Sequence, residues 1–462
     1  MCAALSWTGT LIVARQLGTL DYGSFAFVFN LLGLLGLLAD FETTRVVMAE
    51  LGRGGDEALS HVAGRFIVFR VALGTVTYVL ALVIVLVGPY SHSEVIGVAI
   101  GGLSFFVASA SWSLISICQA KQWLRTVAVA LVAGGVVQFV CILGIHFSGH
   151  ATMVRYIVPY VLSDAVVLVW IAVALRGTVS LRPRLDVAAW RRWFVDATPL
   201  AIGSALGTLY FRIDGVMITL VLHGDASRVA LALYQTGYKF SDLLAFLAPA
   251  LIAASLPLFA AAWPDDHERF RRIFRQTFVI VSVVAVFAVA MFSVFAEPAV
   301  LLWGPQFRAA QTAARLLVIG QACNFLTQLA YVVLVSVGRR RFYPLATACG
   351  LVINVGLNII LIRRYGGNGA AAATIITEVI VLALLVGQVH DLPIRPLPWR
   401  SLGVVAAAGV VAALIGAAVY WLTVWPVGVV AGTIAYVAVL HGGNVEGPGG
   451  LRALWRNSRL GN

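Results

Sequence analysis

Four charged side chains stand out because they lie within long apolar stretches: Arg212 and Asp214 in one stretch, Lys239 and Asp242 in the next. An ionisable group costs about 2.5–3.5 kcal/mol at the bilayer centre, so it normally faces a cavity or a partner. Two cations in apolar segments suit a ligand with an anionic head and an apolar tail. The alternative is an internal ion pair, Asp214 with Lys239 or Lys239 with Asp242, that only stabilises packing.

The spacing of these residues predicts that Arg212 and Lys239 lie at similar depth in a membrane. The turn expected at 223–228 places each cation about 13 residues from its centre, or about 20 Å along a helix. Polar residues recur at i, i+4 and i+7 along the second helix, which indicates one polar face. The predicted substrate-binding residues are Arg212, Lys239, Asp214, Asp242, Gln235, Tyr238 and Arg45.

Other ionisable groups in the apolar stretches have more ordinary explanations. Asp164 and Glu378 fit single acids near an interface, solvated or paired. Arg70 and Arg315 lie near the ends of apolar stretches, where long side chains snorkel to water. The carboxylates that could serve a coupling ion, with none favoured, are Asp40, Glu42, Asp164 and Glu378.

The composition determines the class of protein. Of 462 residues, 61% are apolar and 11% are charged, against about 25% charged in an ordinary soluble domain. About 20 apolar residues span a bilayer core as a helix, and the chain holds many such runs. We therefore expect an all-α integral membrane protein, and soluble, fibrous and disordered classes are excluded.

We count fourteen apolar segments, with six preceding a short polar linker, six following it and a terminal pair. The first segment is short: its fifteen residues, with fourteen rises between them, reach about 21 Å, against a hydrocarbon core of about 30 Å, so we expect a truncated first helix. The segments are 1–15, 24–42, 64–88, 94–117, 127–147, 153–175, 193–222, 229–260, 273–296, 309–337, 343–362, 368–389, 401–423 and 425–441.

This order predicts two six-helix lobes and a C-terminal pair of helices. The linker is rich in arginine and tryptophan, which indicates a helix lying at the cytoplasmic interface. The predicted parts are an N-terminal lobe 1–175, the linker 176–192, a C-terminal lobe 193–389, helices thirteen and fourteen within 401–441, and a tail 442–462.

The positive charges support this segment count. Four of the 32 Lys and Arg residues lie within segments (Arg70, Arg212, Lys239 and Arg315) and six lie in one alternate set of loops (Arg15, Arg155, Arg228, Arg308, Arg363 and Arg364). The other 22 fall in the opposite set. Because cytoplasmic loops carry the excess of Lys and Arg, we expect both termini in the cytoplasm.

Signals for other functions are weak or absent from the sequence. The net charge of +12 is explained by loop arginines, and no basic cluster interleaved with aromatic residues points to nucleic acid. Five scattered cysteines give neither a disulfide framework nor a metal site. There is no GxxxxGK[ST] loop, and the GxGxxA match at 367–372 follows no strand. We therefore expect no cofactor and no enzymatic activity.

Five short strings resemble the oligosaccharide flippase, or polysaccharide biosynthesis protein, family of the multidrug/oligosaccharidyl-lipid/polysaccharide exporter superfamily. The first is similar to R-x-L-G-x-x-x-Y-G-x-F and contributes Arg15, Gly18, Tyr22 and Gly23. The others are Pro199 followed by Tyr210–Asp214, Tyr234–Lys239 with Gly237 in place of the usual alanine, Leu301–Phe307, and Asn354 with Asn358 followed by Tyr365–Ala371. The resemblance runs from Arg15 to about Glu378.

The resemblance implies a two-lobed transporter of fourteen helices. Family members flip undecaprenyl-diphosphate-linked sugar repeat units across the bacterial cytoplasmic membrane for surface polysaccharide (lipopolysaccharide or exopolysaccharide) biosynthesis. The implied partners are the lipid-linked oligosaccharide, membrane lipids, and a polysaccharide polymerase and glycosyltransferases. The sugar is not readable, because members with different substrates share these motifs.

Two other functions remain open from the sequence. One is a cation-coupled multidrug antiporter of the same superfamily, which an acidic cavity would favour. The other is a membrane-embedded polysaccharide polymerase or ligase. Those enzymes typically carry a long extracytoplasmic loop, and every such loop here is short.

Overall fold

The computed structural model describes residues 2–51, 56–179, 182–245, 247–443 and 445 of the chain. Sixteen α-helices and two 3₁₀ helices, with no strand, form the regular structure of this described part. The all-α membrane fold expected from composition is confirmed.

The helices α1 to α8 account for the first half of the chain. They are α1 (Cys2–Asp40), α2 (Thr43–Leu51), α3 (Asp56–Val87), α4 (His92–Gly101), α5 (Ser104–Ala120), α6 (Leu124–Phe147), α7 (Met153–Ala174) and α8 (Val187–Val221). The second half holds α9 (Gly224–Ala245), α10 (Leu247–Ala262), α11 (His267–Val300), η1 (Leu301–Trp303), η2 (Pro305–Phe307), α12 (Ala310–Ser336), α13 (Phe342–Tyr365), α14 (Gly367–Val389), α15 (Trp399–Leu422) and α16 (Trp425–Gly442).

Eleven helical stretches among the described residues are long and apolar enough to cross a membrane, or twelve if the bent helix α8 counts as one span. The chain is thus a multi-pass membrane protein. One stretch, Leu5–Leu51, is 47 residues long and covers the first two predicted segments. The predicted segment 229–260 is shared between α9 and α10. The count of fourteen spans stays a prediction.

The chain divides into two compact units, Met1–Ala232 (unit 1) and Leu233–Asn462 (unit 2). This division falls inside α9, whereas the sequence suggested a division at the linker 176–192. Helix α8 begins at Val187, so the end of that linker is continuous with the next predicted span. The predicted lobes therefore remain a prediction.

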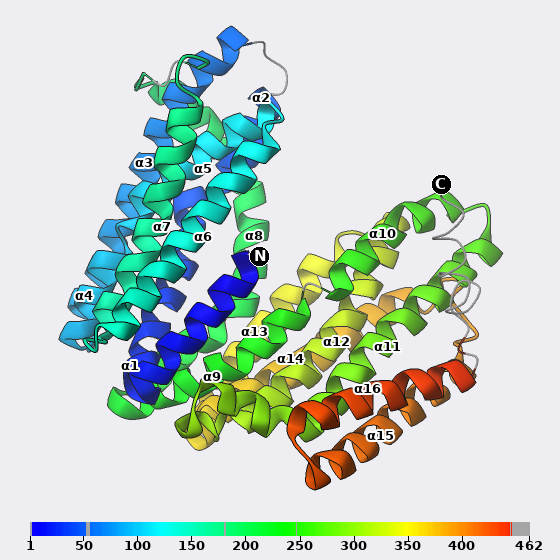
Figure 1. Ribbon diagram of the computed structural model, residues 1–462. Coiled ribbons are helices and arrows are strands. Elements are labelled where there is room, and N and C mark those ends of the chain that lie inside the picture. Colours follow the sequence, from blue (N-terminus) through cyan, green and yellow to red (C-terminus); the bar gives the residue numbers. More distant parts are fainter. Residues whose placement is uncertain (1, 52–55, 180–181, 246, 444, 446–462) are drawn as a thin grey trace. The chain divides into compact units, whose positions relative to one another are not determined.

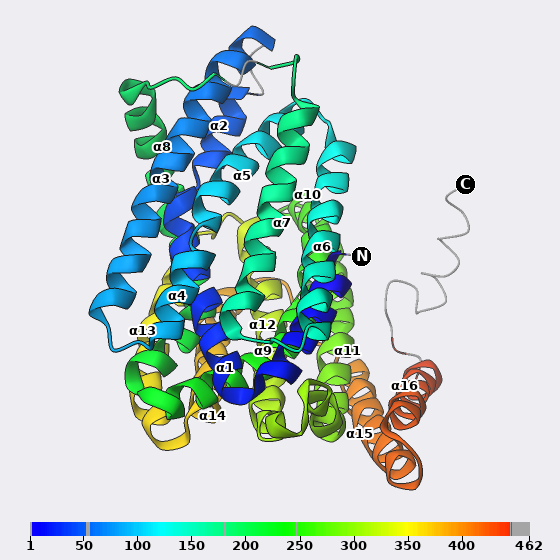
Figure 2. The same ribbon diagram turned by 60° about the vertical axis from the view of Figure 1, so that its left-hand side comes forward.

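Helix α1 is the centre of unit 1, because it contacts α3, α4, α5, α6, α7 and α8. It is broken at Gly18, whose backbone has φ 70° and ψ −176°, a conformation that glycine adopts at little cost. Figures 1 and 2 show the dark blue first part of α1 turning away from the part that follows. The break coincides with the predicted gap between the first two segments.

Near this break, α1 packs tightly on the start of α9. A Cβ atom on Gly23 would lie 2.1 Å from the carbonyl oxygen of Arg228. The guanidinium of Arg228 lies 3.4 Å from Glu94 at the start of α4, and Ser24 donates a hydrogen bond of 2.9 Å to the same carboxylate. Because Glu94 is only 5% exposed, these contacts satisfy a buried charge.

At the other end of unit 1, apolar side chains of α2, α3, α5, α6, α7 and α8 form a common core. Trp193 of α8 is 1% exposed, and its ring lies 5.9 Å from those of Phe66 and Phe69. Its indole N–H donates a hydrogen bond of 2.7 Å to Glu50 of α2. The start of α8 is thereby fixed to unit 1.

In unit 2, the terminal helices α15 and α16 pack on each other and on α11, as the orange and red ribbons of Figure 1 show. Tyr436 of α16 is buried and donates a hydrogen bond of 2.7 Å to the carbonyl of Val283. Outside the spans, Arg339 grips Asp391 through both guanidinium nitrogens. This hydrogen bonding lowers the pKa of Asp391 to about 2.

Replacing Gly23 by alanine tests the packing of α1. The new Cβ meets backbone rather than a movable side chain, so Gly23→Ala should destabilise the protein by about 1–3 kcal/mol through overpacking. The measurement is the thermal unfolding of the purified protein in detergent. Gly144→Ala on α6 is the control, because no atom lies within 4 Å of its Cβ position. Equal melting temperatures for both variants would contradict this packing.

Candidate functional site

A partly buried ion pair joins α1 to α3 within unit 1. Arg70 donates from Nη1 to Asp40 Oδ1, and Thr44 donates to the same oxygen at 2.8 Å. The side chain of Arg70 is 5% exposed and that of Asp40 is 40% exposed. Its place near a span end suggested that Arg70 snorkels to water. Instead, its charge is neutralised by Asp40, 30 residues earlier in the chain.

The junction between α1 and α2 follows this pair directly and has an uncommon backbone. Phe41 and Glu42 have φ of 46° and 53°, a left-handed conformation that costs of order 1–3 kcal/mol per residue unless the surroundings impose it. Contacts to α8 do so here. Ser204 donates to Glu42, and the Phe41 ring stacks on Phe194 at 4.3 Å.

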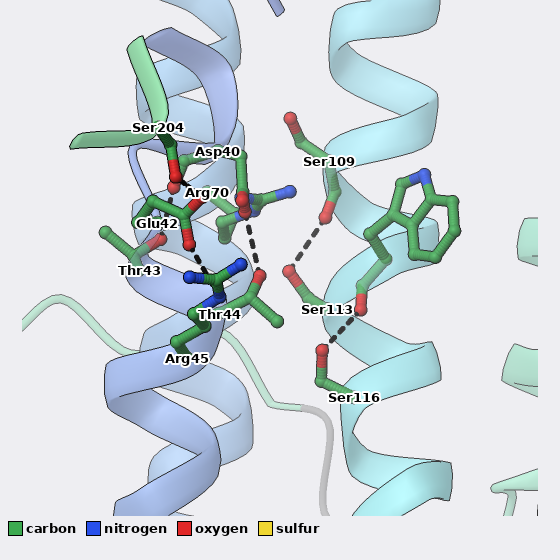
Figure 3. A network of polar contacts seen from close by, with 11 residues as sticks. Asp40, Glu42, Thr43, Thr44, Arg45, Arg70, Ser109, Ser113, Ser116 and Ser204 are labelled. Carbon is green, nitrogen blue, oxygen red and sulfur yellow. Dashed lines mark hydrogen bonds and ion pairs between the residues drawn. The ribbon is translucent and has the colours of Figure 1, made fainter. Parts of the chain in front are cut away.

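Figure 3 shows this polar network in close view, with Arg45 pairing to Glu42 at 2.9 Å. The Arg45 side chain is 68% exposed. The serines of α5 in the same view donate to carbonyls of their own helix, Ser113 to Ser109 at 2.7 Å and Ser116 to Trp112 at 2.8 Å. Their hydroxyl groups therefore donate within α5 and do not link it to a neighbouring helix through these bonds.

Two hollows lie beside the network, both walled by unit 1 alone. The larger has a volume of about 700 Å³ and the smaller about 380 Å³. The larger falls within the range of about 300–1,000 Å³ of small-molecule sites. The hollows share Gly33, Gly36, Asp40 and Arg212 in their walls.

Arg212 is the cation at this shared wall. Helix α8 bends by 61° between Tyr210 and Arg212. The guanidinium lies against α1 at Gly33, where a Cβ would come within 2.9 Å of Nη1. The side chain is exposed, and among the described residues it has no ion pair or hydrogen bond. Such a guanidinium can bind an anion with two parallel donors.

The far wall of the larger hollow combines aromatic rings with hydrogen-bonding groups. Tyr160 of α7 lines this wall together with Gln138, and its ring lies 4.5 Å from that of Phe29. One turn further along α7, Asp164 lines it together with Ser104. Sequence reasoning noted Asp164 but missed the uncharged residues of this wall.

Comparison with known protein families identifies the class of this protein. The family model described as polysaccharide biosynthesis protein matches residues 5–263, more than half of the chain. The chain belongs to the polysaccharide biosynthesis protein family. A second family model, MatE, matches residues 199–360 of this family member. No curated protein sequence matches it.

Solved structures place this polysaccharide biosynthesis protein in the fold of the MOP superfamily. Lipid II flippase MurJ in an inward closed conformation is similar with TM-score 0.72 and 12% identity, covering 95% of this chain and 97% of that one. An inward-facing multidrug resistance MATE transporter has TM-score 0.67 and 16% identity, covering 82% and 92%. A MOP superfamily transporter from Pyrococcus furiosus has TM-score 0.53 and 16% identity, covering 83% and 90%.

The residues of the first family motif lie away from the two hollows and shape α1 instead. Gly18 forms the break, Tyr22 is 2% exposed, and Gly23 packs on Arg228. Arg15 is exposed. In this member of the family, the motif therefore organises the fold near the break.

The other predicted site residues lie on α9 and on α8. On α9, Lys239, Gln235, Tyr238 and Asp242 are half-buried members of unit 2. Asp214, on α8 in unit 1, is 3% exposed. Whether these residues bind substrate stays a prediction.

The turn between α8 and α9 was misplaced by the sequence analysis. The chain leaves helix at Leu222 and His223, earlier than the turn expected at 223–228. Arg212 precedes Leu222 by ten residues and Lys239 follows His223 by sixteen. The equal spacing on which the expected equal depth rested is therefore absent, and the depths of the two cations stay a prediction.

The acidic residue Glu378 of α14 has a partner within unit 2. It is 3% exposed, and Asn324 of α12 donates to both of its oxygens at 3.2 and 3.3 Å. Of the two explanations that the sequence allowed, solvated or paired, the paired one holds.

A double-mutant cycle tests the ion pair between α1 and α3. Asp40→Asn and Arg70→Met should each destabilise the protein by about 1–3 kcal/mol, because each strands the partner's polar group. The double variant should lose less than the sum, with a coupling energy of about 1–2 kcal/mol. The measurement is unfolding in mixed detergent micelles.

The matched control for this cycle is the exposed pair of Glu268 and Arg271 at the start of α11, whose carboxylate side chain is 77% exposed. Its coupling energy should stay below about 0.5 kcal/mol. Equal coupling energies in the two cycles would show that burial does not strengthen the pair of Asp40 and Arg70.

Proposed function

We propose that this protein translocates undecaprenyl-diphosphate-linked oligosaccharides across the cytoplasmic membrane of a bacterium for surface polysaccharide biosynthesis. Membership of the polysaccharide biosynthesis protein family and the MOP fold support transport of a lipid-linked sugar. The short loops and the helical content leave membrane helices to provide the substrate site.

The observation that carries the proposal is the exposed guanidinium of Arg212 at the shared wall of the hollows. A carrier diphosphate presents several anionic oxygens, and a low local dielectric strengthens their attraction to a cation. Asp40 of α1, the acidic residue that lines both hollows, is already paired with Arg70. Arg212 thus remains available for an anionic ligand.

Lys239 is proposed as a second cation for the diphosphate, together with Gln235 and Tyr238, on the grounds of the sequence pattern. Asp214 and Asp242 would moderate these cations until lipid arrives. Arg45, which is exposed beside Glu42, is proposed to meet the head group at the cytoplasmic entrance. This placement rests on the loop arginines, which predict that both termini are cytoplasmic.

A cation-coupled multidrug antiporter is the runner-up. Its cargo is cationic, and Asp164 is a lining carboxylate that would suit such a cargo. The proposal for an anionic lipid carrier rests instead on the exposed guanidinium of Arg212, which lines both hollows and has no ion pair among the described residues. A membrane-embedded polymerase or ligase is less well supported, because the matching families and the similar solved structures are transporters and flippases.

The direct test replaces Arg212 in cells that need this protein for polysaccharide. Arg212→Ala should abolish surface polysaccharide with a normal amount of protein in the membrane, because the side chain is exposed and forms no ion pair or hydrogen bond with another described residue. Arg212→Lys should rescue only partly, since an ammonium does not grip two phosphate oxygens at once. The measurements are surface polysaccharide by immunoblot and protein level in the same membranes.

Arg308→Ala is the control, because this side chain is 68% exposed and pairs with Glu297 outside both hollows. It should leave polysaccharide unchanged. Normal polysaccharide in Arg212→Ala would refute the proposal, and so would disappearance of the Arg212→Ala protein from the membrane.

Gly33 offers a subtler test, because it touches only the end of the Arg212 side chain. In Gly33→Ala the guanidinium must move while the fold is retained. We expect polysaccharide export to fall by about three- to tenfold, equivalent to roughly 0.7–1.4 kcal/mol. Gly144→Ala on α6 is the control, since no atom lies within 4 Å of its Cβ position and it lines neither hollow. Equal export by the two variants would mean that the position of Arg212 against α1 is unimportant.

A further inference from the structure

The larger hollow has features that diphosphate binding does not use. It reaches from Arg212 and Gly33 across α1 and α3 to α5, α6 and α7. Within the described part of the chain, its charged lining residues are two carboxylates and two guanidinium groups, Asp40, Asp164, Arg70 and Arg212. Asp40 and Arg70 pair with each other, which leaves Asp164 as the carboxylate of the interior and Arg212 as the cation of the shared wall. The interior therefore suits a polar ligand that can donate hydrogen bonds to a carboxylate.

Aromatic rings form one part of its lining. Phe29 and Tyr160 lie 4.5 Å apart at an angle of 51°, and the indole of Trp112 is 49% exposed. The face of an aromatic ring is the negative part of its quadrupole. Such faces attract the weakly positive C–H groups on the flat side of a sugar ring, while an anionic ligand gains nothing from them.

Hydrogen-bonding groups lie among these rings. Gln138 offers both donors and acceptors, and an ionised Asp164 offers acceptors only. Gln138 and Asp164 line the hollow together with Tyr160 and Ser104. A carboxylate and an amide that line the same hollow match the adjacent hydroxyl groups of a sugar, each of which both donates and accepts.

The position of the hollow defines which sugar it would receive. Arg212 lies in its wall, and in a lipid-linked oligosaccharide the first sugar is bonded directly to the diphosphate. We propose that the larger hollow is a saccharide subsite for this first sugar. Asp164 and Gln138 bind its hydroxyl groups, and Trp112 covers its apolar side. This proposal rests on the proposed function, because it takes Arg212 as the diphosphate end of the site.

The test compares probes that differ only in the sugar. Purified protein in lipid nanodiscs is titrated with farnesyl diphosphate and with farnesyl diphosphate carrying one glucose, galactose, N-acetylglucosamine or N-acetylgalactosamine. At least one sugar-bearing probe should bind about tenfold tighter than farnesyl diphosphate, as expected for a hydrogen bond to a charged group. If no sugar in the set improves binding, the subsite is refuted.

Variants then separate the sugar from the diphosphate. Asp164→Asn and Trp112→Leu should each leave the affinity for farnesyl diphosphate unchanged. Each should reduce the gain in affinity that the sugar adds to the probe by at least about threefold. Trp170→Leu is the matched control, since Trp170 of α7 is 45% exposed but does not line the hollow. An undiminished gain in both hollow variants, or an equal reduction in Trp170→Leu, refutes the subsite.

Failure of the underlying function is recognised separately. Arg212→Ala should weaken all probes equally, including the sugar-free one. If Arg212→Ala leaves binding of farnesyl diphosphate unchanged, the diphosphate assignment fails. In that case the saccharide subsite is still tested by Asp164→Asn and Trp112→Leu, through the ratio of the affinities for sugar-bearing and sugar-free probes.

Discussion

Neutralisation of charge inside the membrane is the constraint on which the organisation of unit 1 depends. A charged group in an apolar surrounding requires a partner. Asp40 and Arg70 satisfy this between α1 and α3, and Glu94 and Arg228 satisfy it between α4 and α9. Against this background the exposed guanidinium of Arg212 is an exception, because it has neither an ion pair nor a hydrogen bond among the described residues. A charged group without a partner is energetically costly within a membrane. At the wall of a cavity, such a group therefore indicates a site for a charged substrate.

Helix α1 connects these features because it contacts most of its unit. The part of α1 that carries Gly33 lies between the break at Gly18 and the left-handed junction at Phe41 and Glu42. The junction is held by Ser204 and Phe194 of α8, the helix that also carries Arg212. The contacts that impose the strained backbone therefore also keep the Arg212 helix beside α1.

The sequence predicts the fold class well, because about 20 apolar residues in a row have no stable alternative to a membrane helix. It also identifies Arg212, since charge within an apolar run is visible without a structure. It does not predict that Arg70 pairs with Asp40, because pairing across 30 residues depends on how α1 and α3 pack. The turn after α8 was misplaced by a few residues, and the expected equal depth of Arg212 and Lys239 rested on that turn.

Small and uncharged residues show the limit of such reasoning more clearly. The pairs Gly97 with Gly101 and Gly203 with Gly207 have the same spacing, which is typical of close helix packing. Only the first pair packs closely, with Cβ positions 2.9 Å from Val28 and Leu32, while the second has no atom within 4 Å. Gln138, Tyr160 and Trp112 likewise carry no sequence signal, because their function depends on which face of each helix lines the hollow.

The central claim, that Arg212 binds the diphosphate of a lipid-linked sugar, is tested most directly by native mass spectrometry of protein purified with its own lipids. Wild-type protein should retain a polyprenyl-diphosphate-linked saccharide that Arg212→Ala, purified identically, has lost. Equal retention by both proteins, or no such lipid on the wild type, would contradict the account.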